Sequence, residues 1–414
     1  DRERKTIADP KSLALAQAPS RAKQVLKAGD VLISLTRPNL NAIALVPEHL
    51  GGAIGSTGFH VLRSRWLQPK FLLALVQSQN FIGAMSALVQ GALYPAVRPR
   101  DVAAYPFVFE TPQQQARIVA KLEELLSDLD AGVAELKAAQ KKLAQYRQSL
   151  LKAAVEGELT AEWRQHNRPT ESGAQLLERI LTERRARWEA RQLAKFKAQG
   201  KAPPKDWQKK YPEPVRPDTA ELPELPDGWV WASGEQLCEF ITKGTTPPKD
   251  LDLGGPKTIP FLRVTNLTDR GELDLDDEVF VSVETHRGFL ARSAVYPNDV
   301  LMNIVGPPLG QVALVPSTFA EWNINQAIAI FRAVDGVLPS FLCNYLLSPL
   351  AQQWLKVRSK TTAGQTNLTL EVCRSLPFPL PSRDEQQRIL AVIESALDSI
   401  VSQGRSIETA LHQS

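Results

Sequence analysis

Residues 30–47 read DVLISLTRPNLNAIALVP, and residues 299–316 read DVLMNIVGPPLGQVALVP. The two stretches lie at an offset of 269 residues and are identical at 9 of 18 positions. Two shorter matches follow, Phe71-Leu72 with Phe341-Leu342 and Arg117-Ile118 with Arg388-Ile389, and their offsets grow by single residues. Short loop insertions would produce such a drift. The self-similarity predicts that one domain is present twice. A protein of this kind is expected to contact two similar targets at a fixed separation.

Length and composition describe an ordinary globular chain. The 414 residues suffice for two to three domains, each with its own core. The three cysteines (Cys238, Cys343, Cys373) form no CxxC pair and have no histidine cluster beside them. We therefore expect no metal site and no disulfide framework, and a reducing cytoplasm fits. No run of eighteen apolar residues occurs, so no membrane span is expected.

Charge is unevenly distributed. The chain carries a formal net charge of +4, whereas residues 179–210 contain eleven Lys or Arg against three acids. A basic segment of this kind suits a polyanion. A solvated helix face followed by a linker explains this stretch equally well.

Local patterns predict a mixed α/β first copy over residues 1–110. Strands are expected at 31–35 and 42–46, a helix over 69–88, and a closing strand over 102–109. A long amphipathic helix then runs from Gln113 to about Leu159, with Thr111 as its cap. At 1.5 Å per residue it would be roughly 65–70 Å long. A second long helix begins at Ser382, after the second copy.

Apolar residues recur along both helices at three- and four-residue spacing, which is typical of a coiled-coil seam. The seam positions are Ile118, Leu122, Leu125, Leu129, Leu136, Leu143 and Leu150 in the first helix, and Ile389, Ile393, Ile400 and Ile407 in the second. The two helices most simply pack on each other, and a pseudo-twofold relation between the copies would make that pairing antiparallel. Two independent surface helices, each docked on its own domain, remain the alternative.

The expected organisation has five parts. Residues 1–110 form the first domain and 111–159 the first long helix; residues 160–225 contain a basic helix (173–199) and a stiff proline-rich linker; residues 226–381 form the second domain and 382–414 the second helix. The offset places Asp1 opposite Arg270, so about 43 residues of the first copy's opening are expected to be missing. The predicted fold class is thus α+β, with two repeated domains and paired long helices.

Several motifs together resemble the specificity (S) subunits of type I restriction–modification enzymes. In the second copy they are Pro226-Asp227-Gly228-Trp229, Gly244-Thr245-Thr246-Pro247, Ile259 to Val264, Asn298 to Leu301, Thr362 to Asn367, and Phe378 to Pro381 running into Glu385 to Ile389. The first copy keeps Ala28 to Ser34 and Gln113 to Ile118 in matching places. Each motif is weak alone, but their order and duplication are specific.

The resemblance implies two target-recognition domains, each reading one half of a split sequence in double-stranded DNA. The long helices would act as spacer and as docking surface for two modification methyltransferase subunits, which would bind S-adenosylmethionine, and through them for restriction or translocase subunits. No cofactor is expected in this chain. Tyr94-Pro95-Ala96 stands where the second copy has Gln365-Thr366-Asn367, so two different half-sites are expected.

Candidate DNA contacts follow from side-chain chemistry, because Arg, Lys, Asn, Gln and Thr in loops read base edges or anchor phosphates. The candidates are Lys243, Thr245, Lys249, Arg263, Arg358, Lys360, Thr361, Gln365 and Asn367 in the second copy, and Arg37, Arg63, Tyr94, Arg98 and Arg100 in the first. Arg332, which aligns with Arg63, is left out because a duplicated arginine after a strand suits a structural role. For any single candidate, a structural role is an equal alternative.

Catalytic patterns find little support. Gly306-Pro307-Pro308-Leu309 lacks the leading Asn or Asp and the aromatic residue of an adenine methyltransferase motif, and no GxGxxG or Walker lysine motif occurs. We therefore expect a non-catalytic DNA-recognition subunit. Two alternatives stay open: a fragment of a fused restriction–methylation enzyme, which the length of the natural reading frame would reveal, and a coiled-coil scaffold without DNA binding, which would enrich no sequence from a random duplex library.

Overall fold

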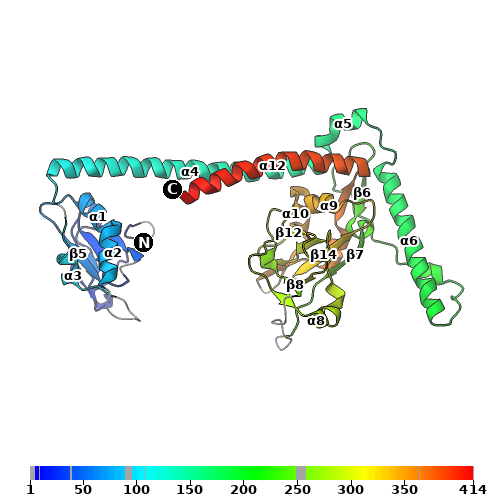
Figure 1. The fold of residues 1–414 in the computed structure, drawn as a ribbon, viewed down its shortest axis with the longest axis horizontal. Coiled ribbons are helices and arrows are strands. Elements are labelled where there is room, and N and C mark those ends of the chain that lie inside the picture. The colour runs from blue at the N-terminus through cyan, green and yellow to red at the C-terminus, as the bar shows by residue number, and fades with distance from the viewer. Residues whose placement is uncertain are drawn as a thin grey trace. The chain divides into compact units, whose positions relative to one another are not determined.

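The structure is a computed structural model that describes residues 5–8, 10–37, 40–88, 96–107, 109–248, 258–362 and 364–413 (Figure 1). The chain divides into two compact units, residues 1–135 and 136–413. The boundary falls inside one helix, α4 (Pro112–Val155), whereas the five-part division expected from the sequence ended the first domain before it. Each unit is described by itself.

The first unit is built on a small antiparallel sheet in the order β3-β2-β5. Its strands are β2 (Val31–Ser34), β3 (Ile43–Leu45) and β5 (Phe59–Leu62), and a separate ribbon pairs β1 (Ala22–Val25) with β4 (Ile54–Ser56). The helices are α1 (Pro69–Gln77), α2 (Gln79–Ala87) and α3 (Pro99–Ala103). Val31 and Ile33 from the sheet meet Leu72, Val76 and Phe81 from the helices in one buried core.

The second unit contains the fuller copy, with a four-stranded sheet in the order β12-β10-β14-β7. These strands are β7 (Cys238–Lys243), β10 (Val300–Asn303), β12 (Val312–Leu314) and β14 (Ile328–Ala333). Three smaller sheets join β13 (Asn323–Ile324), β8 (Ile259–Leu262) and β9 (Phe280–Val281); β11 (Val305–Gly306), β16 (Gln365–Asn367) and β15 (Lys360–Thr362); and β17 (Pro377–Leu380) with β6 (Val230–Ser233). Its helices are α5 (Ala161–His166), α6 (Gly173–Ala198), α7 (Gly234–Leu237), α8 (Val283–Arg287), α9 (Pro339–Leu347), α10 (Pro349–Arg358), α11 (Leu370–Ser375) and α12 (Arg383–Gln413).

Strand register confirms the internal repeat. In the first copy, Val31 pairs with Leu45 on one side and Leu62 on the other. In the second, Val300 pairs with Leu314 and with Phe331, which are the positions 269 residues further on. Both strand pairs in each copy are antiparallel, so the residues that are identical between the copies occupy equivalent positions in the two sheets. The predicted α+β class and domain duplication are correct.

The duplicated helix start provides a second structural match. The side-chain oxygen of buried Gln115 accepts the backbone N–H of Gln68 at 2.8 Å, and that of Gln386 accepts the backbone N–H of Leu338 at 2.9 Å. Each glutamine thereby anchors the first turn of a long helix to the residue that precedes α1 in the first copy and α9 in the second. In both copies the long helix is fixed to its domain at the same point.

Two predicted elements of the first copy were wrong. The helix expected over 69–88 is broken at Ser78, whose extended backbone ends α1 and whose hydroxyl accepts the N–H of Phe81 to cap α2. The closing strand expected over 102–109 begins instead as α3, which Pro99 starts and the Asp101 carboxylate caps. The equivalent strand in the second copy, β17, pairs with β6, and the described part of the first copy has no counterpart of β6.

The region expected to be a linker is folded onto the second domain. Ser233 donates from its hydroxyl to the carbonyl of Val215 at 2.6 Å, and Trp231 donates from its indole to the carbonyl of Pro223 at 3.2 Å. Residues 212–226 lack regular secondary structure, as the prolines predicted. These hydrogen bonds nevertheless fix the segment in place, so the proline-rich stretch is part of the second unit rather than a boundary.

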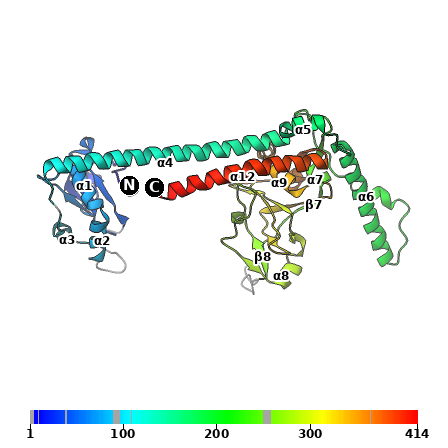
Figure 2. The same ribbon diagram turned by 45° about the horizontal axis from the view of Figure 1, so that its top comes forward.

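The two long helices meet within the second unit. In both views the last turns of α4 and the first turns of α12 lie side by side and run in opposite directions (Figures 1 and 2). Leu151 and Val155 of α4 join Ile389 and Ile393 of α12 in one buried core. The predicted antiparallel pairing is therefore present at this end of the helices.

Candidate nucleic-acid interface

Backbone hydrogen bonds bring several loops of the second copy to one end of its main sheet. The N–H of Thr245 donates to the carbonyl of Ile324, and the N–H of Asn325 donates to the carbonyl of Leu262, directly before Arg263. The N–H of Ile304 donates to the carbonyl of Ala327, and that of Leu368 donates to the carbonyl of Ile304. The loops that contain Lys243, Thr245, Arg263 and residues 360–367 are thus adjacent, although they are up to 124 residues apart in the sequence.

A hairpin on this face carries four predicted contact residues. Its strands pair Lys360 with Asn367 and Thr361 with Thr366, and β16 also pairs with β11. Because side chains alternate across a strand, Lys360, Gln365 and Asn367 lie on one face of the hairpin, while Thr361 lies on the other. Lys360 and Gln365 are exposed, and Asn367 is half-buried. The hairpin is thus part of a three-stranded sheet, and a β-ribbon can enter the major groove of DNA.

Two predicted arginines of the second copy are held by neighbours. Arg263 donates to a carboxylate oxygen of Asp277 at 2.6 Å and to the Asp277 carbonyl at 3.1 Å, so its guanidinium is partly neutralised. The Arg358 guanidinium lies over the ring of Trp354 at 4.2 Å from the centroid, at the end of α10. The stacked Arg358 keeps its hydrogen-bond donors available, and Arg263 keeps fewer. Lys249 lies outside the described residues.

The first copy places Arg37 on the matching loop. The backbone of Arg37 has a positive φ of 51° and its side chain is exposed. A bridge between Thr36 and Ala96 occupies the place of the β11–β16 pairing in the second copy. Arg98 and Arg100 lie at the start of α3 and are also exposed, while Tyr94 lies outside the described residues. The two copies therefore present different side chains at the same place in the fold.

Arg63 has the structural role that we assigned only to Arg332. The Nε and terminal nitrogen of Arg63 donate to the two carboxylate oxygens of buried Asp30, each at 2.6 Å. Arg332 makes the same bidentate pair with Asp299, at 2.7 Å for each bond. A guanidinium committed in this way contributes to folding, so Arg63 is a poor candidate for base contact. Sequence alignment found the equivalence but not the carboxylate partner 33 residues earlier.

Sequence reasoning also missed a buried carboxylate that joins three segments of the second unit. Glu385, at the start of α12, is 2% exposed. It accepts hydrogen bonds from the hydroxyl of Thr160 at 2.7 Å and the indole of Trp229 at 2.9 Å, and it pairs with Arg164. The signal was present, because both Glu385 and Trp229 belong to the family-like motifs. We read those motifs as fold markers and did not expect their residues to meet.

The seam predictions divide into two groups. Leu150, Ile389 and Ile393 are buried, whereas Ile118, Leu122, Leu125 and Leu129 are exposed, and Leu136 and Leu143 are half-buried. The side chains of Ile400 and Ile407 lie outside the part of the chain whose burial is described. The exposed leucines form an apolar stripe on a helix surface, and their role in docking a partner stays a prediction.

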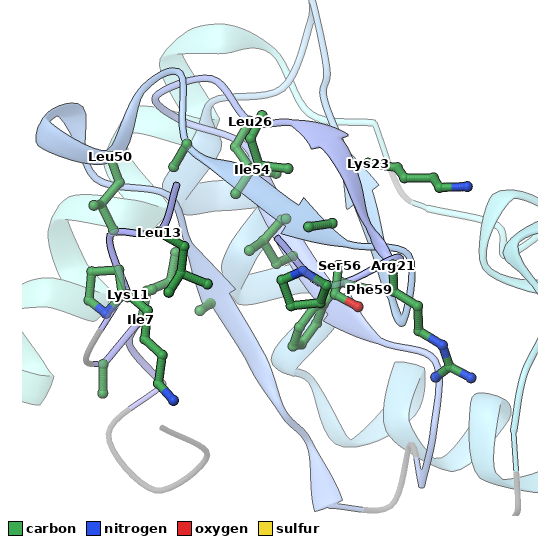
Figure 3. Close-up of a pocket in the computed structure, with 18 of the residues that line it drawn as sticks. Ile7, Lys11, Leu13, Arg21, Lys23, Leu26, Leu50, Ile54, Ser56 and Phe59 are labelled. Carbon is green, nitrogen blue, oxygen red and sulfur yellow. The ribbon is translucent and has the colours of Figure 1, made fainter. Parts of the chain in front are cut away.

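The first unit also contains a large apolar cavity of about 990 Å³. Ile7, Leu13, Leu26, Ile54 and Phe59 line it, and the charged ends of Lys11, Arg21 and Lys23 extend away from the apolar lining (Figure 3). Among the described residues that line it, none is a histidine, cysteine or carboxylate. The lining is therefore mainly apolar, with lysine, arginine, serine and threonine as its polar residues.

Three titratable groups outside this face, Cys343, Cys373 and His286, are buried in the second unit. Burial raises the pKa of the Cys343 and Cys373 thiols to about 12, so both stay protonated at neutral pH. Burial lowers the pKa of His286, whose ring contacts the Asn323 amide at 2.9 Å. Within the described ranges, no group of three His, Cys, Asp or Glu side chains could hold a metal ion. Neither α4 nor any other described helix is apolar over a length that would cross a membrane.

The fold and the face define a duplicated α+β binding protein with polar loops at one end of each copy. Residues 226–408 match the family described as Type I restriction modification DNA specificity domain. The chain is 28% identical over 304 residues to the EcoBI specificity subunit of Escherichia coli, covering 72% of this chain and 53% of that protein. It is 24% identical over 312 residues to the EcoDI specificity subunit of the same species, and the match covers 74% of this chain and 58% of that protein. The chain thus spans little more than half the length of these curated relatives.

Solved structures show the same fold. A structure titled for complex assembly and conformational transition of the type I R-M system superposes with a TM-score of 0.67 at 24% identity, covering all of this chain and 85% of the other. The HsdS subunit from Thermoanaerobacter tengcongensis gives a TM-score of 0.52 at 24% identity, with 99% and 82% covered. Residues 226–408 thus match the DNA specificity domain of type I restriction–modification systems, and the chain is similar to specificity subunits of this type over about three quarters of its length.

Proposed function

We propose that this chain is the non-catalytic DNA-recognition subunit of a type I restriction–modification complex and that it reads a bipartite target. One observation carries the proposal: two copies of one fold, held by the same buried Asp–Arg pair, present different polar side chains at the same place. Two domains with the same fold but different loop side chains are suited to bind two DNA blocks of different sequence. The relatives' name, specificity subunit, supports this function.

The chemistry of the second copy's face suits direct readout. Amide side chains such as those of Gln365 and Asn367 make paired hydrogen bonds with adenine in the major groove. Lys243 and Lys360 are exposed beside them and would anchor phosphates. Phosphate contacts fix position and amide contacts distinguish bases, so one hairpin supplies both parts of a specific interface.

The long helices supply the remaining function. We propose that the exposed stripe containing Leu125 and Leu129 docks modification methyltransferase subunits, two per complex, which bind S-adenosylmethionine and bring restriction subunits with them. The exposed leucines support this role, because a large apolar stripe on a helix is typical of a partner surface. Such a complex would work in the cytoplasm, where genomic DNA is accessible.

Selection from a random duplex library tests the function. The full chain, mixed with the methyltransferase subunits of its proposed complex, should enrich two defined blocks separated by an unspecified gap. Binding should weaken as salt rises, because phosphate contacts release counterions. A library that yields no enriched sequence would contradict the proposal and would favour a coiled-coil scaffold.

Gln365→Ala tests the readout by the hairpin. We expect the variant to lose about 5- to 150-fold discrimination at one base pair of one block, because one good bidentate contact is worth about 1–3 kcal/mol. The other block should stay as in the wild type. The measurement is the same library selection, with Thr366→Ala on the opposite hairpin face as the matched control. Changes in both blocks would show that the substitution disturbs folding rather than readout.

Leu125→Glu combined with Leu129→Lys tests the docking stripe. The pair is spaced to form a favourable i,i+4 ion pair, and both positions are exposed, so we expect the free energy of unfolding to stay within about 0.5 kcal/mol of the wild type. Association with methyltransferase subunits in size-exclusion chromatography should be lost. The matched control, Ser127→Glu with Ala131→Lys, changes the opposite helix face and should assemble normally. Normal assembly of the leucine variant would exclude the stripe as a docking site.

A further inference from the structure

Residues 185–211 form an arm that extends from the second domain and is stabilised by its own aromatic cluster. The arm comprises the last turns of α6 and the return segment with a short helical turn at Trp207–Lys210. Trp188 stacks on Trp207 with ring centroids 5.7 Å apart, and Tyr211 meets Trp188 edge-on at 5.4 Å. Phe196 packs against Trp207 at 6.1 Å. The arm has no large hydrophobic core, and these aromatic contacts stabilise its conformation.

The base of the arm is fixed to the domain. Leu176 and Ile180 of α6 are buried in the core of the second unit, and Arg184 donates to the carbonyl of Cys238 at 2.6 Å. In both views α6 leaves the α12 end of this unit and runs along the side of the domain, in the direction in which β8 and α8 lie (Figures 1 and 2). Arg184 contacts the first residue of β7, so the base of the arm lies at the other end of this strand from Lys243 of the candidate face.

The charges on the arm are strongly unbalanced. Its two acids are engaged locally, Glu189 with Arg185 at 3.2 Å and Asp206 with Lys209 at 3.0 Å. Seven further cations have no carboxylate within ion-pair distance among the described residues: Arg187, Arg191, Lys195, Lys197, Lys201, Lys205 and Lys210. These seven exceed the net charge of +4 of the whole chain. A rigid element with this excess stores unfavourable repulsion that a polyanion would relieve.

The surface chemistry favours nucleic acid over protein. Protein–protein interfaces are depleted of lysine and rich in exposed aromatic residues, whereas the arm uses its aromatic side chains internally and exposes lysines. Arg187, Arg191 and Lys195 follow each other at four-residue spacing along α6, so they lie about 6 Å apart on neighbouring turns. Each DNA strand has one phosphate per 3.4 Å of helix axis. The spacing therefore allows one cation for about every second phosphate.

We propose that the arm binds the sugar–phosphate backbone of DNA flanking the half-site of the second domain, without reading sequence. The proposal rests on the proposed DNA recognition, and it adds a contact surface outside residues 226–408, the range that matches the specificity domain. The arm would increase affinity equally for every sequence and would leave base preference to the loops. Its contribution would depend on salt and on the presence of flanking DNA.

The test compares two variants that each remove three exposed lysines. The arm variant is Lys195→Gln, Lys197→Gln and Lys201→Gln; the matched control, on α4, is Lys137→Gln, Lys141→Gln and Lys142→Gln. Glutamine has nearly the helix propensity of lysine, so both helices should be kept. Near-ultraviolet circular dichroism should report an unchanged stack of Trp188 on Trp207. Fluorescence anisotropy then measures affinity for the selected duplex and for a scrambled duplex at several salt concentrations.

We expect the arm variant to bind both duplexes more weakly, by about fivefold per lost phosphate contact at 0.15 M salt. The slope of log K against log salt concentration should become shallower by about 0.9 per lost contact. The ratio between the two duplexes should not change, and the loss should disappear on duplexes trimmed to the recognised blocks. Equal losses in the arm and control variants would overturn the proposal. So would unchanged DNA affinity with lost methyltransferase association, which would make the arm a protein-docking surface. If the wild type shows no preference between the two duplexes, the proposed recognition function fails, while the difference between the variants still decides the role of the arm.

Discussion

Asp299→Ala is expected to lower the free energy of unfolding of the second unit by about 3–5 kcal/mol, because it leaves the half-buried guanidinium of Arg332 without its partner. Asp299 is 2% exposed and accepts two hydrogen bonds from Arg332 and one from the N–H of Tyr296 at 2.8 Å. The Arg332 guanidinium lies between the rings of Phe240 and Tyr296, at 4.4 and 4.7 Å from their centroids. Water therefore cannot easily replace the lost carboxylate.

The repeat supplies a matched control, Asp30→Ala. Asp30 makes the equivalent bonds to Arg63 and to the N–H of Lys27, but the Arg63 side chain is 46% exposed and that of Arg332 only 23%. Water can solvate the released Arg63, so the expected loss is about 1–2 kcal/mol. Hydrogen exchange of β10 and β2 amides measures the two losses separately within the full chain. Equal small losses at both sites would contradict the argument from burial.

The first-copy pair also predicts a pH dependence. Burial alone would raise the pKa of Asp30, but hydrogen bonds from Arg63 and from the N–H of Lys27 outweigh it, and the pKa lies below its ordinary value of 3.8. A lowered pKa in the folded state means that the stabilisation is present above pH 3.8 and is lost as pH falls through the folded-state value. The stability difference between wild type and Asp30→Ala should therefore be constant near neutral pH and shrink in acid.

The sequence predicted the features that depend on the internal sequence repeat and on helical periodicity. The duplication, the long helices and their buried ends at Leu150, Ile389 and Ile393 were all recognisable, because each is a local or a self-similar pattern. The Asp30–Arg63 pair was not recognised, because its two residues are 33 positions apart and only strand pairing brings them together. Alignment showed that Arg63 and Arg332 are equivalent, and it could not show what each one contacts.

The candidate site and the arm show the same limit. Lys360, Gln365 and Asn367 were chosen for their chemistry, but their common face depends on the register of a hairpin that no local pattern fixed. Residues 200–211 were expected to be linker because they are rich in lysine and proline. The stacking of Trp207 on Trp188 makes this stretch part of a folded arm. Tertiary contacts between residues 19 positions apart leave no periodic signal in the sequence.

Inserting one helical turn into α4 is expected to change the gap between the two DNA half-sites and to leave each half unchanged. Duplicating residues 141–144 between the anchors at Gln115 and Leu151 adds about 6 Å to the helix, which is close to two base pairs of DNA. Four residues rotate the helix by about 40° beyond a full turn, and two base pairs rotate DNA by about 70°. The remaining mismatch of about 30° is small enough for both domains to engage. The native target should bind at least 100-fold more weakly, because one of its halves no longer reaches its domain.

Library selection with the insertion variant measures this effect, since the enriched gap should lengthen by about two base pairs. The matched control places the same four residues after Thr219, in the exposed irregular segment, where they lengthen the chain without lengthening α4. The control should keep the native gap. A changed base preference within either block, with an unchanged gap, would show that α4 does not set the spacing. A rigid spacer helix should change the length of the gap and should leave base preference to the loops. The opposite result would therefore exclude α4 as the element that fixes the distance between the two domains.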